Sequence, residues 1–274
     1  MTSKLLFLIL LASLLLLSCS TSSQYYDIEE ISPIQNISFD ASAWFWKIPQ
    51  GPYAIGIAWD DGMFGSGALE AAREYAAVSL SRNKGSFVVD KSMIVSLAAE
   101  RTIDWQQAGY ELVVSADTAF LHYANAHLVQ VDSYAINGYL ICLFYLPETN
   151  FGNAKPKVDS AIRPMQVLSF PSWCSDPELS TNDSNVYSVA SSHQASLIDA
   201  IFFAQEKALK QLGRYRLQNV VSRVLATDSM LEKAIAMETV TQNKHTMIDQ
   251  IFVYHIKIDN TPSYRAFIRL KGDL

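Results

Sequence analysis

The chain has 274 residues, 50 % of them hydrophobic, and carries 21 Lys and Arg against 27 Asp and Glu, a net charge of −6 at pH 7. That composition is sufficient for a hydrophobic core and argues against intrinsic disorder. The acidic balance without a Lys/Arg cluster argues against nucleic acid as a partner and against an electrostatic contact with anionic lipid.

The N-terminal segment has the pattern of a lipoprotein signal peptide. Lys4 precedes a leucine-rich apolar run over residues 5–17, which is shorter than the roughly 17–25 apolar residues of a membrane-spanning helix. The run is typical of the hydrophobic region of a signal peptide. At its end, Leu16-Leu17-Ser18-Cys19 resembles the lipobox that the bacterial lipoprotein signal peptidase recognises. We therefore expect cleavage before Cys19 and acylation of Cys19, the alternative being an ordinary secreted protein with a coincidental cysteine.

Two features near Cys19 predict where the acylated chain resides. Ser20, rather than an aspartate, follows the acylation residue, which favours transport to the outer membrane with the folded part facing the periplasm. Residues 20–40 are polar and aperiodic, and about 20 flexible residues span roughly 25 Å. The sequence thus predicts a tether between membrane lipid and the folded part.

The folded part carries an internal duplication. Alternating residues 53–58 precede a glycine-rich turn and a helix with small side chains at four-residue intervals, and residues 187–192 precede a second such helix. Small residues spaced by four lie along one stripe of a helix, where they allow close packing on a sheet. The two ladders are Ala68, Ala72, Ala76 and Leu80 in the first copy and Ala200, Ala204, Ala208 and Leu212 in the second.

Extended segments follow each helix in the same order. A β-branched run comes first, at 87–89 and at 220–225, and each copy ends on a hairpin pattern. Asn137-Gly138 between 128–136 and 139–146 is a strong hairpin signal, and residues 260–263 separate 251–259 from 264–270.

We therefore predict an α+β fold of two tandem small domains, each a helix packed on a small, mostly antiparallel sheet in the order β-α-β-(α)-β-β. The alternative is two unlike subdomains that share a helix pattern by chance. The expected boundaries are 1–18 for the signal peptide, 19–40 for the tether, 41–147 for the first domain, 148–170 for a linker and 171–274 for the second domain.

These elements resemble the LPP-20-like lipoprotein family of bacterial outer membranes. The matching features are Trp44 followed by Pro49, the strand at 53–58, the first alanine ladder, and Val129-Gln130-Val131-Asp132-Ser133-Tyr134 before Gly138-Tyr139. The second copy is more diverged, with Ala190 and Ser191 at the positions of Gly56 and Ile57. The resemblance implies a non-enzymatic, envelope-associated protein and transfers no active-site residue.

Two cysteines and an aromatic run are candidate features of the folded part. Cys142 and Cys174 are the cysteines besides Cys19, and in an oxidising compartment they form a candidate disulfide pair. The alternative is two separate buried thiols, because neither lies in a recognisable framework. The run Trp44-Phe45-Trp46 could stack on a ligand such as peptidoglycan, or pack across the end of a sheet.

No motif predicts catalysis, a metal site or a cofactor. The glycine-rich turn at 62–67 fits neither the dinucleotide-binding nor the P-loop spacing, and Asp60-Asp61 suit helix capping better than metal binding. Ser66, His193 and Asp61 are the residue types of a catalytic triad, but the sequence has no G-x-S-x-G elbow that would present a nucleophilic serine. The histidines lack the spacing of a helical zinc motif; they are His122, His127, His193, His245 and His255.

The sequence therefore predicts a lipid-anchored structural or interaction component of the outer membrane. Its expected partner is another envelope protein or a second copy of the chain. The alternative function is a periplasmic ligand- or peptidoglycan-binding lipoprotein, and a hydrolase is a third. A pocket with convergent polar groups would favour the second function, and a nucleophile with a base within about 3 Å would favour the third.

Overall fold

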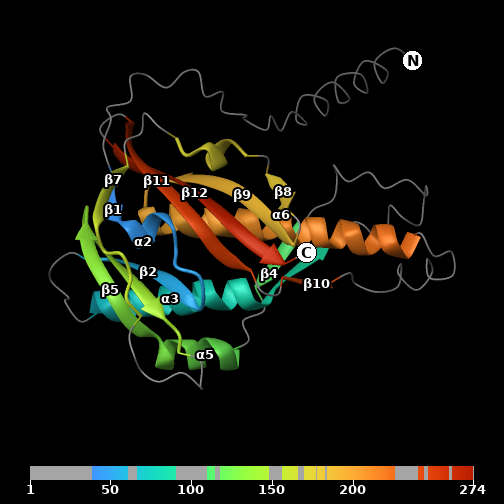
Figure 1. Cartoon of the computed structure of the whole chain (residues 1–274), viewed down its shortest axis with the longest axis horizontal. Helices are drawn as coiled ribbons and strands as arrows, with labels where there is room; N and C mark the ends of the chain where they lie inside the picture. The colour runs from blue at the N-terminus through green and yellow to red at the C-terminus, as the bar shows by residue number, and fades with distance from the viewer. Residues whose placement is uncertain are drawn as a thin grey trace, which may run out of the picture. The chain divides into compact units, whose positions relative to one another are not determined.

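The computed structural model describes residues 39–60, 67–90, 110–114, 118–147, 156–165, 170–176, 178–182, 184–225, 240–243, 246–258 and 261–273 (Figure 1). The described elements are β1 (Phe39–Ser42), α2 (Ala43–Trp46), β2 (Tyr53–Trp59), α3 (Gly67–Gly85), β3 (Ser86–Asp90), β4 (Tyr110–Val114), α5 (Thr118–His127), β5 (Val129–Ile136), β6 (Tyr139–Tyr145), β7 (Ile162–Met165), η2 (Ser172–Ser175), β8 (Leu179–Asn182), β9 (Asn185–Gln194), α6 (Leu197–Leu225), β10 (Val240–Asn243), β11 (Met247–Ile258) and β12 (Thr261–Asp273). They belong to one compact unit that covers residues 35–274. Among the described helices, none is long and apolar enough to cross a membrane.

The first half is a helix on a three-stranded antiparallel sheet of order β2-β6-β5. The predicted ladder residues Ala72 and Ala76 of α3 are fully buried and pack on this sheet. Because Gly56 of β2 lies directly beneath the helix, a Cβ built there would stand only 2.1 Å from the Ala72 carbonyl oxygen. The hairpin turns at Asn137 and Gly138, both with positive φ, as a tight two-residue turn requires.

The second half repeats this arrangement. Its sheet has the order β11-β12-β9-β8, so the first strand of the unit, β9, again pairs with the last strand of the hairpin, β12. Helix α6 covers one face through Ala200, Ala204 and Ala208, all fully buried. The strand, helix and hairpin therefore recur in the same order and with the same pairing in both halves, and the α+β class with small antiparallel sheets is confirmed.

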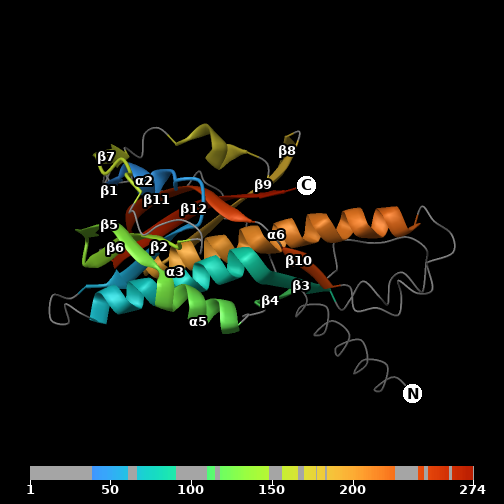
Figure 2. The same ribbon diagram turned by 60° about the horizontal axis from the view of Figure 1, so that its bottom comes forward.

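The two halves are joined by a shared sheet and by their helices. Strand β3 of the first half pairs with both β4 and β10, so that the second half contributes one strand to the sheet β10-β3-β4. Helices α3 and α6 lie side by side and run in the same direction (Figures 1 and 2). The expected domain boundaries at 147 and 171 thus fall within one unit whose halves exchange contacts.

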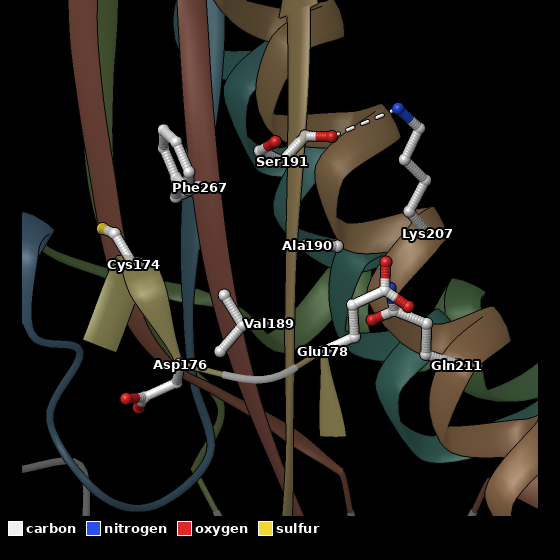
Figure 3. A pocket seen from close by; sticks show the side chains of 9 residues that line it. All are labelled: Cys174, Asp176, Glu178, Val189, Ala190, Ser191, Lys207, Gln211 and Phe267. Atoms are coloured by element: carbon white, nitrogen blue, oxygen red, sulfur yellow. Dashed lines mark hydrogen bonds between the residues drawn. The ribbon is translucent and has the colours of Figure 1, made fainter. Parts of the chain in front are cut away.

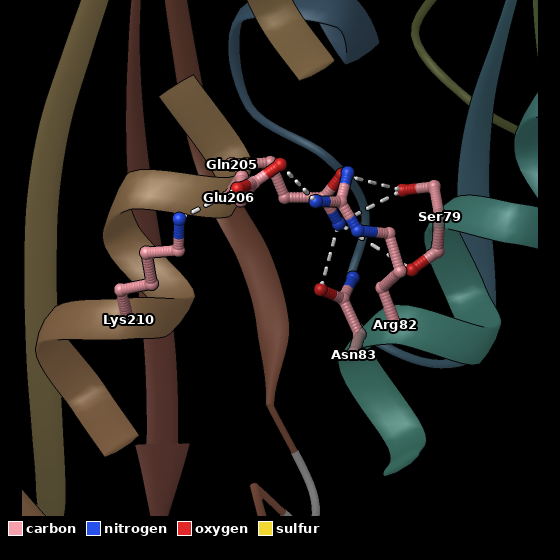
Figure 4. A network of polar contacts seen from close by, with 6 residues as sticks. All are labelled: Ser79, Arg82, Asn83, Gln205, Glu206 and Lys210. Carbon is pink, nitrogen blue, oxygen red and sulfur yellow. Dashed lines mark hydrogen bonds and ion pairs between the residues drawn. The ribbon is translucent and has the colours of Figure 1, made fainter. Parts of the chain in front are cut away.

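A polar network connects α3 to α6 (Figure 4). The Gln205 amide donates to Asn83 Oδ1 at 2.9 Å and to Ser79 Oγ at 3.1 Å. Arg82 is 1 % exposed, lies 3.2 Å from the Glu206 carboxylate and stacks over the Phe202 ring. Buried charges require such partners, because an unpaired one costs several kcal/mol. The network therefore fixes the two helices against each other.

The aromatic run after the tether packs into the core rather than facing solvent. Trp44, Phe45 and Trp46 lie in α2 and are at most 9 % exposed. The Trp44 ring contacts Tyr134 of β5, and the Trp46 ring contacts Phe252 of β11. The packing alternative for this run is confirmed, and α2 links the sheets of both halves.

Two expectations about local structure are corrected. Residues 220–225, expected as a strand, are the C-terminal end of α6, because extending a helix adds one hydrogen bond per residue and outweighs a small β propensity. In the last hairpin Ile258 pairs with Thr261, so the connection is 259–260 rather than 260–263. Pro262 is tolerated there because, among the strands that the structure describes, β12 has only β11 as a neighbour at that point.

The expected tether and linker also contribute a pair of strands. Phe39 and Asp40, placed in the tether, lie in β1, and residues 162–165 of the linker form β7, which pairs with β1. Phe39 is fully buried. The signal segment, Cys19 and the rest of the tether lie outside the described residues.

Candidate functional site

A groove lies along the edge of the second sheet, where β9 runs between α6 and the chain that leads into β8 (Figure 3). Its volume is about 290 Å³. Residues from four elements and one connecting segment line it: Cys174, Asp176, Glu178, Val189, Ala190, Ser191, Lys207, Gln211 and Phe267.

The floor of the groove is the backbone of β9. Strand β8 pairs with residues 185–188 of β9, and the last contact on this side is the Val189 N–H, which donates to the Glu178 carbonyl at 3.1 Å. Beyond Val189, within the described part of the chain, β9 pairs only with β12. The segment 190–194 is therefore a sheet edge with one hydrogen-bonding side open.

Helix α6 provides one wall. Lys207 and Gln211 are four residues apart and so lie on the same face of the helix. The Lys207 ammonium donates to the Ser191 carbonyl at 3.1 Å, while the Gln211 amide oxygen accepts from the Ser188 hydroxyl at 2.6 Å. Lys207 thus occupies a backbone acceptor that a neighbouring strand would otherwise use.

The opposite wall comes from η2 and from the outer face of the sheet. Phe267 of β12 pairs with Ser191, and Cys174 lies in η2 beside them (Figure 3). Burial and the nearby Asp176 carboxylate raise the pKa of the Cys174 thiol to about 12, an effect that Arg269 only partly offsets. Because the thiolate is the nucleophilic form, this cysteine is not suited to covalent chemistry near neutral pH.

A serine and a histidine lie near the far end of the groove strand. The His193 Nε2 and the Ser263 Oγ are 2.9 Å apart, which meets the distance criterion for a nucleophile and its base. However, the Ser263 hydroxyl also donates to the Ile256 carbonyl, and Ser263 is only 9 % exposed. Partial burial and the Arg265 charge lower the pKa of His193. Among the described residues, no carboxylate orients this imidazole.

The other residues singled out in the sequence do not converge. His122 and His127 are exposed on α5, and His255 stacks on Tyr264 in the last hairpin. Asp61, Ser66 and His245 lie outside the described residues. No group of three or more His, Cys, Asp or Glu side chains that could hold a metal ion occurs in the described part of the chain.

The candidate disulfide is not formed in the structure. Cys142 and Cys174 are both free thiols. Cys142 is buried on the face of β6 that packs against α3, with its pKa raised to about 12 by burial, whereas Cys174 lies in η2 against the second sheet. They belong to different packing environments, which is the physical reason that the expected pairing is absent.

Sequence reasoning missed the groove, because it depends on where β8 stops pairing with β9. Pro171 and Pro177 flank the segment that becomes η2, and proline cannot donate in a strand ladder. This spacing is the signal that could have indicated a chain leaving the sheet edge. The pairing of Lys207 with Ser191, by contrast, requires the helix and strand to be placed first.

No family model matches the chain, and no curated protein matches it. Among solved structures, the chain is similar to a hypothetical protein from Francisella tularensis, with 12 % identity over 81 % of this chain and 83 % of that chain and a TM-score of 0.17. A TM-score this low carries no argument about fold or function.

Proposed function

We propose that the chain is a lipid-anchored component of the bacterial outer membrane, whose folded part faces the periplasm and binds an envelope protein without catalysing a reaction. The observation that carries this proposal is Leu16-Leu17-Ser18-Cys19 after an apolar run too short to span a bilayer. The resemblance of the first half to LPP-20-like lipoproteins supports the same placement.

The start of the folded part is compatible with an anchor at Cys19. Phe39, the first described residue, is fully buried in the core. About 20 residues separate it from Cys19, and a tether of the kind expected from the sequence would span roughly 25 Å. Each buried methylene of an acyl chain contributes about 0.8 kcal/mol, so that several chains hold a protein on a membrane far more firmly than one.

A second candidate function is ligand binding in the periplasm, and the groove beside β9 favours it. The groove combines charged side chains with open backbone groups, which is what a polar ligand or a peptide would need. This candidate is compatible with lipid anchoring, and the two differ in what the folded part binds.

The anchor is tested by replacing Cys19 with serine in the full chain and following a radioactive palmitate label in growing cells. Cys19→Ser should lose the label and leave the precursor unprocessed, because serine cannot form the thioether that acylation requires. Cys174→Ser is the matched control, since it removes a cysteine from the folded part, and it should retain the label. A Cys19→Ser chain that still carries palmitate and is still processed would refute the proposal.

A further inference from the structure

The open edge of β9 is the floor of a groove with two unlike walls, and its closed end is formed by Glu178, the residue before β8. We propose that this groove binds an extended peptide segment of a partner protein as an added strand, and that the segment carries a basic side chain recognised by Glu178. The proposal deepens the interaction role given above and rests on it.

Two hydrogen bonds establish the backbone directions of β9. In a strand, the N–H and C=O of one residue point to the same side, and successive residues alternate. The Val189 N–H bonds to Glu178, and the Ser191 carbonyl bonds to Lys207, both on the side away from β12. Ser191 and His193 therefore direct their backbone groups into the groove, where a further strand could pair with them.

Strand β8 shows that this edge accepts an antiparallel strand. It pairs with residues 185–188 in continuous register, and only the departure of the chain toward η2 ends the pairing. An added peptide would occupy the track that β8 leaves, next to residues 190–194. Main-chain hydrogen bonds give affinity in such strand addition, and pockets for alternate side chains give specificity.

The walls of the groove determine which side chains fit. Val189, Cys174 and Phe267 make one wall mainly apolar, so a peptide side chain on that face should be aliphatic. The Glu178 carboxylate points toward α6 beside Gln211 (Figure 3) and forms no ion pair with another described residue. A basic side chain of the peptide would supply the missing countercharge.

Lys207 controls access to the edge. Edge strands are commonly protected from unwanted pairing by lysine, and here the ammonium holds the Ser191 carbonyl. A bound peptide strand must displace it and take over that acceptor. Removal of the ammonium should therefore strengthen peptide binding, whereas loss of an ordinary ligand-contacting residue would weaken it.

The test uses the full chain purified in detergent and two fluorescein-labelled hexapeptides, one alternating lysine with valine and one alternating glutamate with valine. Fluorescence anisotropy should give an affinity for the lysine peptide at least about tenfold higher than for the glutamate peptide, a difference of about 1.4 kcal/mol. A lysine peptide methylated on alternate backbone nitrogens should lose about tenfold in affinity, because it cannot donate to the edge. The methylation is made in both registers, so that one of them blocks the amides that face β9.

Two variants locate the binding. Glu178→Lys should weaken binding of the lysine peptide by about two- to fivefold, the range of exposed ion pairs, while Glu70→Lys on α3 serves as the matched control and should leave it unchanged. Lys207→Ala should strengthen binding by a similar factor. Circular dichroism melts establish that each variant is folded.

Equal binding of both peptides, or binding that neither of the two methylated peptides weakens, would overturn the proposal. Sedimentation of the chain alone gives a further check, because self-association that Lys207→Ala enhances would make a second copy, and not a partner peptide, the occupant of the edge. Palmitate labelling does not depend on the groove. Failure of peptide binding with intact labelling would therefore remove this inference and leave the anchored function standing.

Discussion

Replacing Gly56 with alanine is expected to destabilise the protein through a collision between β2 and α3. The new Cβ would lie 2.1 Å from the Ala72 carbonyl oxygen, 2.7 Å from its carbonyl carbon and 2.6 Å from Cε2 of Phe144. Two of these atoms are helix backbone, so the helix must retreat by about 1 Å along its contact with the sheet. Overpacking typically costs about 1–3 kcal/mol, and we expect about 3 kcal/mol because the colliding atoms are backbone and cannot rotate away.

Thermal unfolding followed by circular dichroism measures this effect. For a chain of this size, 1 kcal/mol corresponds to about 2–4 °C, so the melting temperature should fall by about 6–12 °C. Ala190, at the equivalent position of the second half, provides the control, because Ala190→Gly removes a methyl group without a collision and should cost about 1 kcal/mol. If Gly56→Ala lowers the melting temperature no more than Ala190→Gly does, the close approach of α3 to β2 is wrong.

Three further predictions concern the helix network, the aromatic run and the serine–histidine pair. Burial opposes ionisation of Glu206, but the hydrogen bonds and charges of its basic neighbours outweigh that effect and lower the pKa of Glu206 below 4.5. The stability that this carboxylate contributes should therefore be complete above pH 4.5, and it should be lost as the pH falls through the pKa of the folded state. Glu206→Gln should cost about 3 kcal/mol in urea unfolding at pH 7, since it leaves the buried Arg82 without a counterion, and should remove that acid-dependent loss of stability. Trp46→Ala should cost about 3–5 kcal/mol in the same assay, because it empties the contact between α2 and β11. A fluorophosphonate probe should label neither the wild-type chain nor Ser263→Ala, and labelling of the wild type that the substitution abolishes would instead establish a nucleophilic serine.

Local signals in the sequence predicted those elements whose structure is decided by a few neighbouring residues. Asn137 and Gly138 determine a tight turn through their tolerance of positive φ, and the structure places both there. The alanine ladders predicted both helix-on-sheet contacts, because spacing by four selects one helix face whatever the rest of the fold does. Recurrence of these features in the same order allowed the duplicated architecture to be predicted.

Features that depend on contacts between distant segments could not be predicted in this way. Strand β1 forms because residues 162–165 reach it, and β3 finds a second partner in β10. Neither pairing can be recognised from the alternation of apolar and polar residues, because the short strands involved are not periodic enough to be distinguished from linkers. Residues 220–225 were predicted as a strand for a related reason. Their β-branched side chains give only a weak preference for a strand, and the continuation of α6 overrides that preference.

The contacts between the halves argue that the duplicated units have become mutually dependent. A chain cut in the linker would leave the edge of β3 without β10 and would leave Arg82, 1 % exposed, without Glu206. An uncompensated buried charge costs about 3–5 kcal/mol, which is a large part of the 5–15 kcal/mol by which proteins are usually stable. A chain cut in the linker is therefore expected to lose a large part of its stability in both halves.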